Sequence, residues 1–256
     1  MSGLAATAAP APDAWSFWQQ HDNTNQATID HSTWQRLLDQ YVRTDESDIN
    51  LVDYVALAQD GRDTLTDYLS FLTSLDPRTY NREEQFAYWV NLYNALTIEV
   101  VLRYPKKNSI LRMGKKFFSI GPWDDKLIEI AGQSVTLNDI EHRILRPLWQ
   151  DHRIHYAVNC ASLGCPNLSK TAFTATNLEE QLTLAEARYT NHPRGVKIDG
   201  SKVRLSSIYK WYRDDFGDSE LAVLQHLSER NPDLLKLDLN AASVKYDYNW
   251  TLNRQQ

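Results

Sequence analysis

The chain has 256 residues, of which 42% are hydrophobic, 23% charged and 11% aromatic, so it can bury a substantial core. This composition excludes a disordered chain and a small disulfide-stapled scaffold. The net charge of −6, from 27 basic and 33 acidic residues, provides no broad cationic surface, and we expect no nucleic-acid partner.

The first fourteen residues, MSGLAATAAPAPDA, are rich in Ala and Pro. They predict a disordered tail, which is either the remnant of an export signal on a periplasmic or secreted protein or a plain tail on a cytoplasmic one. No run of about 18 apolar residues occurs, so we expect no membrane span. Residues 15–253 contain no repeat and no Gly/Ser-rich linker, and we expect them to form a single globular domain.

The first third of the chain is predicted to be mostly helical. Apolar residues recur at three-and-four spacing from Trp34 to Val42 and again from Leu65 to Leu72. The run from Glu83 to Tyr104 contains no Gly or Pro, follows a capping pair at Asn81, and predicts the longest helix. Its apolar residues cover nearly all sides, so this helix should lie in the middle of the fold.

Two asparagines, Asn91 and Asn94, lie on this central helix and should be buried with it. Buried amides must be hydrogen-bonded. These two could bind a substrate or stabilise an oxyanion, although holding the backbone of an adjacent loop is the commoner use of such amides.

The second half mixes strands and helices. The helices are predicted over 136–146, where Pro147 should end the helix, and over 177–190, 206–216 and 221–227; the strands are predicted over 117–120, 126–135, 154–160, 243–252 and a hairpin around Asp199-Gly200. The fold class is therefore α+β, with a helix-rich N-terminal part and a long central helix packed on an antiparallel sheet, an arrangement compatible with a papain-like or transglutaminase-like fold.

Both cysteines of the chain, Cys160 and Cys165, lie in one loop after a predicted strand. A strand-end loop can hold a nucleophilic thiol rigidly and leave it exposed. Three alternatives remain open: a disulfide between the two cysteines, a metal site formed with His142 and His155, and a pair of inert buried thiols.

The partner of such a thiol follows from the expected strand geometry. Alternation along a strand places His155 and Cys160 on opposite faces, roughly 16 Å apart, so His155 could serve only Cys165. We therefore expect Cys160 to attack a carbonyl, His142 to act as the base, and Glu141 to orient the imidazole. Glu141 and His142 diverge by about 100° on a helix, so Glu141 could instead pair with an Arg such as Arg146.

Five segments between about residue 80 and residue 253 occur in a fixed order: FAYWVNLYNALTIEVVLRYP, TLNDIEHRILRP, HYAVNCASLGCPNL, SSIYKWYRDDFG and YDYNWTLN. Together they resemble the family called domain of unknown function 547, in its bacterial, exported type. The resemblance implies a shared polar residue set, with no assigned reaction: Asn91 and Asn94, then Asp139 to His142, then His155 with Cys160 and Cys165-Pro166.

Two functions from different classes are compatible with these residues. The first is a cysteine-dependent hydrolase or acyltransferase, similar in logic to papain-like peptidases and transglutaminases, acting on a peptide-like or glutathione-like amide or thioester. Asn91, Asn94 and Asn159 are its candidate substrate-binding residues. The second is a non-catalytic binding module for a small thiol, a peptide or a protein partner. We expect no cofactor in either case.

Overall fold

The central helix, α4, spans Arg82–Arg103 and agrees with the prediction to within one residue at each end. The side chain of Asn81 caps it by accepting a hydrogen bond from the backbone N–H of Glu84, and Pro105 follows its end. Nearly every residue of α4 is buried, including both asparagines. The protein is described here by a computed structural model that covers residues 9–114 and 121–255.

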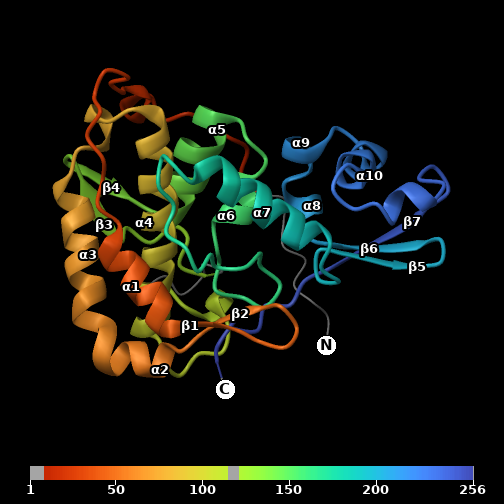
Figure 1. The fold of residues 1–256 in the computed structure, drawn as a ribbon, viewed down its shortest axis with the longest axis horizontal. Helices are drawn as coiled ribbons and strands as arrows, with labels where there is room; N and C mark the ends of the chain where they lie inside the picture. Colours follow the sequence, from red (N-terminus) through yellow and green to blue (C-terminus); the bar gives the residue numbers. More distant parts are fainter. Residues whose placement is uncertain (1–8, 115–120, 256) are drawn as a thin grey trace.

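Helices surround α4 on most sides (Figure 1). The expectation that it packs on an antiparallel sheet is wrong, because strands of three residues are about 10 Å long and cannot cover a 22-residue helix of about 33 Å. The elements that pack most closely on α4 are α2 (Tyr54–Ala56), α3 (Arg62–Ser74), the 3₁₀ turn η3 (Pro77–Thr79) and the π-helical turn η5 (Asp139–Leu145). The same part of the fold contains α1 (Ser32–Tyr41), the π-helical turn η2 (Leu57–Gly61) and the 3₁₀ turns η1 (Ser16–Gln19) and η4 (Ile110–Arg112).

Within the described residues the strands form three small sheets, in a mixed α+β fold that is about 47% helix. Two are antiparallel hairpins, and in the third β6 pairs with β5 antiparallel and with β7 parallel. The strands of the described residues are β1 (Val42–Thr44), β2 (Asn50–Val52), β3 (Ile128–Ile130), β4 (Gln133–Val135), β5 (Val196–Asp199), β6 (Lys202–Ser206) and β7 (Ser243–Asp247). The strand predicted over 117–120 lies outside the described residues.

The strand predicted over 154–160 does not form. Residues Ile154–Ala157 form one helical turn, α6, and the chain becomes extended only at Val158. The carboxylate of Asp151 accepts a hydrogen bond from the backbone N–H of Arg153 and so favours this turn. The argument that placed His155 and Cys160 on opposite faces of a strand therefore does not apply.

The helix predicted over 136–146 forms, but Pro147 does not end it. Thr136 and Asp139 make a capping box at its start, and η5 follows. Pro147 then lies in the first turn of α5 (Arg146–Trp149), where a missing N–H is tolerated. The helix ends at Gln150, whose φ of 51° is left-handed.

The C-terminal third contains the remaining helices, and the helix predicted over 206–216 is two separate turns that meet at Tyr212. These helices are α7 (Leu178–Thr190), α8 (Ile208–Trp211), α9 (Arg213–Phe216), α10 (Glu220–Ser228) and the 3₁₀ turn η6 (Leu234–Lys236). In Figure 1, α8 to α10 and β5 to β7 lie to one side of the helical N-terminal part.

Two hydrophobic clusters correspond to these two parts. One is built around α1, α3 and α4, and the other around α7 to α10 and the β5–β7 sheet. Within residues 9–114 and 121–255, no helix has the length and apolar character needed to cross a membrane. The loop that carries both cysteines runs between the two clusters.

Candidate functional site

The backbone that leads into the cysteine loop is held by Asn94 of α4. Its amide nitrogen donates to the carbonyl of Ala157 at 3.0 Å, and its amide oxygen accepts from the N–H of Asn159 at 2.8 Å. The Asn159 side chain in turn donates to the carbonyl of Pro166 at 2.7 Å. Both ends of the loop are therefore fixed by amide side chains in the core.

Cys160 lies in this loop, and its thiol has three polar neighbours. The Cys160 Sγ is 3.1 Å from the Sγ of Cys165, 3.3 Å from the Oγ of Ser162 and 3.1 Å from the Oη of Tyr248. Both cysteines are free thiols, and their sulfurs are farther apart than the about 2.05 Å of a disulfide bond. Cys160 is partly exposed, whereas Cys165 is buried.

These neighbours give the two thiols opposite properties. A hydrogen bond from Cys165 lowers the pKa of Cys160; burial opposes this, but donors on Ser162 and Tyr248 lower the pKa further. Burial raises the pKa of Cys165 well above its usual range, and its role as donor to Cys160 raises it more. Of the two thiols, Cys160 is therefore the one whose pKa is lowered, and the hydrogen bond from Cys165 favours its ionised form.

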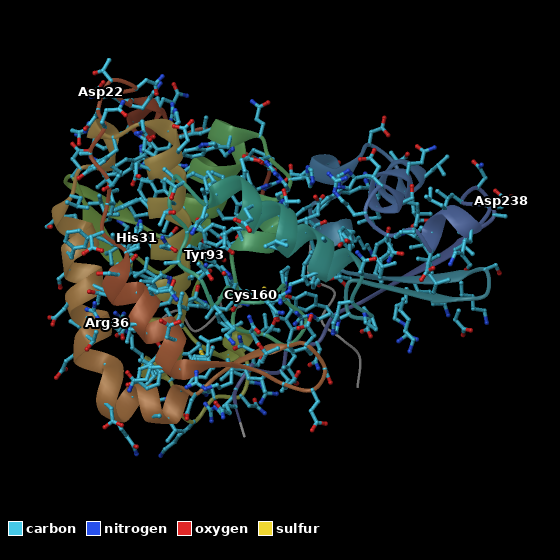
Figure 2. All side chains as sticks on the ribbon, in the orientation of Figure 1. Asp22, His31, Arg36, Tyr93, Cys160 and Asp238 are labelled. Atoms are coloured by element: carbon cyan, nitrogen blue, oxygen red, sulfur yellow. The ribbon has the colours of Figure 1, made fainter. Side chains whose placement is uncertain are left out.

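A cavity of about 310 Å³ opens beside Cys160, between the two hydrophobic clusters. Figure 2 shows Cys160 and Tyr93 near the middle of the molecule. The cavity brings together all five predicted catalytic residues, Glu141, His142, His155, Cys160 and Cys165. Much of its remaining wall is aromatic, from Tyr93, Trp123, Trp211, Tyr212, Tyr248 and Trp250.

His142, on η5, is buried and contacts an arginine. The Nη1 of Arg146 lies 3.1 Å from the Nδ1 of His142. Since a guanidinium can only donate, Nδ1 accepts this bond and the proton of the neutral ring is on Nε2. Burial lowers the pKa of His142; Glu141 counteracts this, and Arg146 adds to the lowering. His142 is thus a neutral imidazole.

His155 has a different partner, Asp215, which comes from α9. The His155 Nε2 and the Asp215 Oδ2 are 2.6 Å apart, and the ring stacks on Tyr212 with a centroid separation of 3.9 Å. Arg146 also donates to Asp215, at 2.6 and 3.1 Å. Burial opposes ionisation of Asp215, but its bonds with His155 and Arg146 lower its pKa strongly. A carboxylate that orients an imidazole is typical of acid–base sites.

Glu141 and Asp215 face different nitrogens of the His155 ring, Nδ1 and Nε2 respectively. Its Oε1 is 3.8 Å from the His155 Nδ1, and its Oε2 accepts from the hydroxyl of Tyr93 at 3.1 Å. Burial opposes ionisation of Glu141, but His142, His155, a hydrogen bond from Tyr212 and Arg146 outweigh it and lower its pKa. The result is a buried, ionised carboxylate beside two imidazoles.

Asn91 is directed elsewhere. Its amide holds the backbone of Phe173, donating at 2.7 Å and accepting at 3.1 Å. The amides of Asn91, Asn94 and Asn159 are thus all hydrogen-bonded to backbone, and none of the three lines the cavity. Their geometry matches the commoner use of buried amides.

Residues 9–14, expected to belong to a disordered tail, are bonded along the cavity edge. The carbonyl of Pro10 accepts from Arg146 at 2.6 Å, the N–H of Asp13 donates to the carbonyl of His142 at 3.1 Å, and the N–H of Ala9 donates to the carbonyl of Trp211 at 3.3 Å. Ala9 and Pro10 line the cavity. Residues 1–8 lie outside the described part of the chain.

The alternative metal site does not assemble. In the part of the chain that the structure describes, no three donor atoms from Cys160, Cys165, His142 and His155 come within 4.8 Å of one another. Nothing in their geometry therefore favours an ion held by the thiols.

Comparison with protein families identifies one domain. The family model described as "Protein of unknown function, DUF547" matches residues 77–190, so this segment is a DUF547 domain. Searches of the curated proteins and of the solved structures found no match. The matched segment contains the central helix, both cysteines and the predicted histidines, whereas Asp215 and Tyr248 follow it in the chain.

Sequence reasoning missed Asp215, Arg146 as its partner, and Tyr248. Asp215 belongs to the charged and aromatic stretch 210–216, which is typical of an exposed helix face. One signal could have pointed to Asp215 and Tyr248. Both residues lie in segments that carry the family resemblance, SSIYKWYRDDFG and YDYNWTLN.

Proposed function

We propose that the protein is a cysteine-dependent hydrolase or acyltransferase that acts on a peptide-like or glutathione-like amide or thioester. One observation carries the proposal: a partly exposed thiol with a lowered pKa, Cys160, shares a cavity with Glu141, His142 and His155. The thiolate is the reactive form of cysteine, and perturbed titratable groups in one cavity favour a catalytic site.

In the proposed reaction the Cys160 thiolate attacks the carbonyl carbon of the substrate. The carbon–sulfur bond to Cys160 forms and the bond to the leaving nitrogen or sulfur breaks; a leaving amine takes a proton from the acid–base residue, whereas a thiolate leaves without one. Water or a thiol then attacks the acyl carbon and gives its proton to the acid–base residue, or to the solvent where that residue has kept its own. As the new carbon–oxygen or carbon–sulfur bond forms, the bond to the Cys160 Sγ breaks and the Cys160 thiolate is restored. Three polar neighbours contact the Cys160 sulfur and favour its ionised form, so we assign the acid–base residue to the leaving group.

We assign that proton transfer to His155, oriented by Asp215. Its Nε2 is held by Asp215 at 2.6 Å, and its Nδ1 lies 3.8 Å from a carboxylate oxygen of Glu141, so each ring nitrogen faces a carboxylate. The predicted base, His142, has Nδ1 occupied by Arg146 and would act in this geometry as a hydrogen-bond donor through Nε2. Which histidine transfers the proton stays a prediction.

The buried amides enter the proposal as positioning residues. Asn94 and Asn159 fix the backbone on each side of Cys160, and Asn91 fixes the loop at Phe173. The aromatic wall would contact the substrate. We also propose a periplasmic or secreted location, on the composition of residues 1–14 alone.

The test uses acyl donors that differ only in their leaving group. Intact-protein mass spectrometry after incubation with matched peptide and γ-glutamyl thioesters and amides should reveal an acyl adduct on Cys160. Cys160→Ser should form none. His155→Ala should slow the amide by on the order of 10²-fold or more and the thioester much less, because a thiolate leaves without a proton. His142→Ala should affect both donors alike.

Absence of any adduct, or an adduct that persists in Cys160→Ser, would contradict the proposal. A binding module is the second candidate, and one observation favours it: within the described residues no imidazole is hydrogen-bonded to the Cys160 sulfur. For a binding module, Cys160 should react with iodoacetamide no faster than free cysteine at pH 6 to 7, and Cys160→Ser should leave ligand affinity unchanged.

A further inference from the structure

A second cluster of titratable side chains lies away from the cavity and has no part in the proposed reaction. It contains His152, from the turn between α5 and α6, Glu186 of α7 and His226 of α10. These three elements are distant in the sequence and meet beside the second hydrophobic cluster. Their donor atoms all lie within 4.8 Å of one another.

The distances between the Glu186 oxygen and the two imidazole nitrogens suit ligands of one metal ion. The Oε1 of Glu186 is 2.8 Å from the Nε2 of His152 and 3.7 Å from the Nε2 of His226. Zinc bonds of about 2.0 Å in tetrahedral geometry place donor atoms about 3.3 Å apart, which lies between these two values. The two rings are nearly perpendicular, at 83°, with centroids 4.4 Å apart.

An ion-pair network explains only part of the cluster. Glu186 is 1% exposed, and its carboxylate is stabilised by His152 and by Arg230, whose Nε is 3.0 Å from Oε2. His226 adds no hydrogen bond to this network within the described residues. Its buried Nε2 lies 3.7 Å from the same Glu186 oxygen that His152 contacts.

We propose that His152, Glu186 and His226 bind one Zn²⁺ ion. Two imidazole nitrogens and one carboxylate oxygen form a donor set that suits zinc, and three protein ligands leave a fourth position for water. Arg230 would hold the other carboxylate oxygen and leave Oε1 for the metal. The side chains of His152 and His226 are 27% and 20% exposed, so the cluster lies near the protein surface.

The proposed ion joins segments that lie on either side of the boundary of the DUF547 domain. His152 and Glu186 belong to the matched segment 77–190, and His226 lies beyond it. Bound metal would therefore hold α10 against α7. This inference does not depend on the proposed cysteine chemistry.

The experiment uses the full chain, treated with EDTA and then dialysed. Zn²⁺ titrated calorimetrically should bind at one equivalent, and Co²⁺ should give the intense visible bands of a tetrahedral site. Glu186→Gln and His226→Asn should each weaken Zn²⁺ binding at least tenfold. Mg²⁺ should not bind, because this ion prefers all-oxygen ligands.

The control is the double variant Cys160→Ser, Cys165→Ser, which should bind Zn²⁺ like the original chain. The spectrum of the Co²⁺ form gives a second readout independent of folding in the variants, since thiolate ligands add strong near-ultraviolet charge-transfer bands and this site should show none. No uptake of Zn²⁺ would overturn the proposal. So would uptake that survives Glu186→Gln and His226→Asn, or uptake that is lost in the cysteine variant.

Discussion

Cys165 should control the reactivity of Cys160. Cys165→Ala removes the donor whose sulfur is 3.1 Å from the Cys160 Sγ and which lowers the pKa of Cys160 most. A hydrogen bond to a charged group is worth about 1.5–3 kcal/mol, and one pKa unit corresponds to 1.36 kcal/mol. The pKa of Cys160 should therefore rise by about 1–2 units, and its alkylation at a fixed pH below the midpoint should slow by about 10–100-fold.

The assay is the rate of iodoacetamide labelling at Cys160, followed by mass spectrometry across a pH series. Cys165→Ser is the matched variant, because a hydroxyl keeps a donor at nearly the same place, and its titration midpoint should stay close to the original. Ser162→Ala removes a lesser donor and should shift the midpoint less. The reasoning fails if Cys165→Ala and the original chain titrate with the same midpoint.

Three other predictions concern stability. Burial lowers the pKa of His31 to about 4, so below pH 6.5 the unfolded chain binds a proton that the folded chain does not. The free energy of unfolding should therefore fall by about 2 kcal/mol between pH 6.5 and 5. Urea unfolding of His31→Asn should show no such pH dependence. Asn94→Ala should cost roughly 2–4 kcal/mol and alter the alkylation profile of Cys160, whereas Asn91→Ala should cost a similar amount and leave that profile unchanged, by the same two assays. If the chain is one domain, limited proteolysis between residues 105 and 117 should not release two independently folded halves; recovery of such halves would contradict it.

Local patterns predicted the elements of the fold better than their arrangement. The central helix, its Asn81 cap and the hairpin at Asp199-Gly200 each depend on neighbouring residues, and the structure confirms them. The turn α6 was missed because its apolar alternation resembles a strand, and the decisive Asp151 contact is a single hydrogen bond. The packing around α4 was missed because no local pattern shows which elements meet.

In the candidate site, too, residues close in the sequence could be predicted to lie together, whereas distant ones could not. The two cysteines could be predicted to lie together because they share a loop, and the polar residues of the motif helices could be grouped by the family resemblance. Asp215 meets His155 across 60 residues, and Tyr248 meets Cys160 across 88. No helix or strand period connects residues so far apart, so these partners became visible only in the structure.

A fragment limited to the segment that the family model matches would lose several residues of the cavity. A fragment of residues 77–190 would retain both thiols and both histidines but would lack Tyr248 and Asp215. Its Cys160 would lose one of its donors, and His155 would lose the carboxylate that orients it. The apolar faces that now contact Trp211 and Trp250 would be open to water and prone to self-association. An inert or aggregating fragment would thus say nothing about the chemistry of the whole chain.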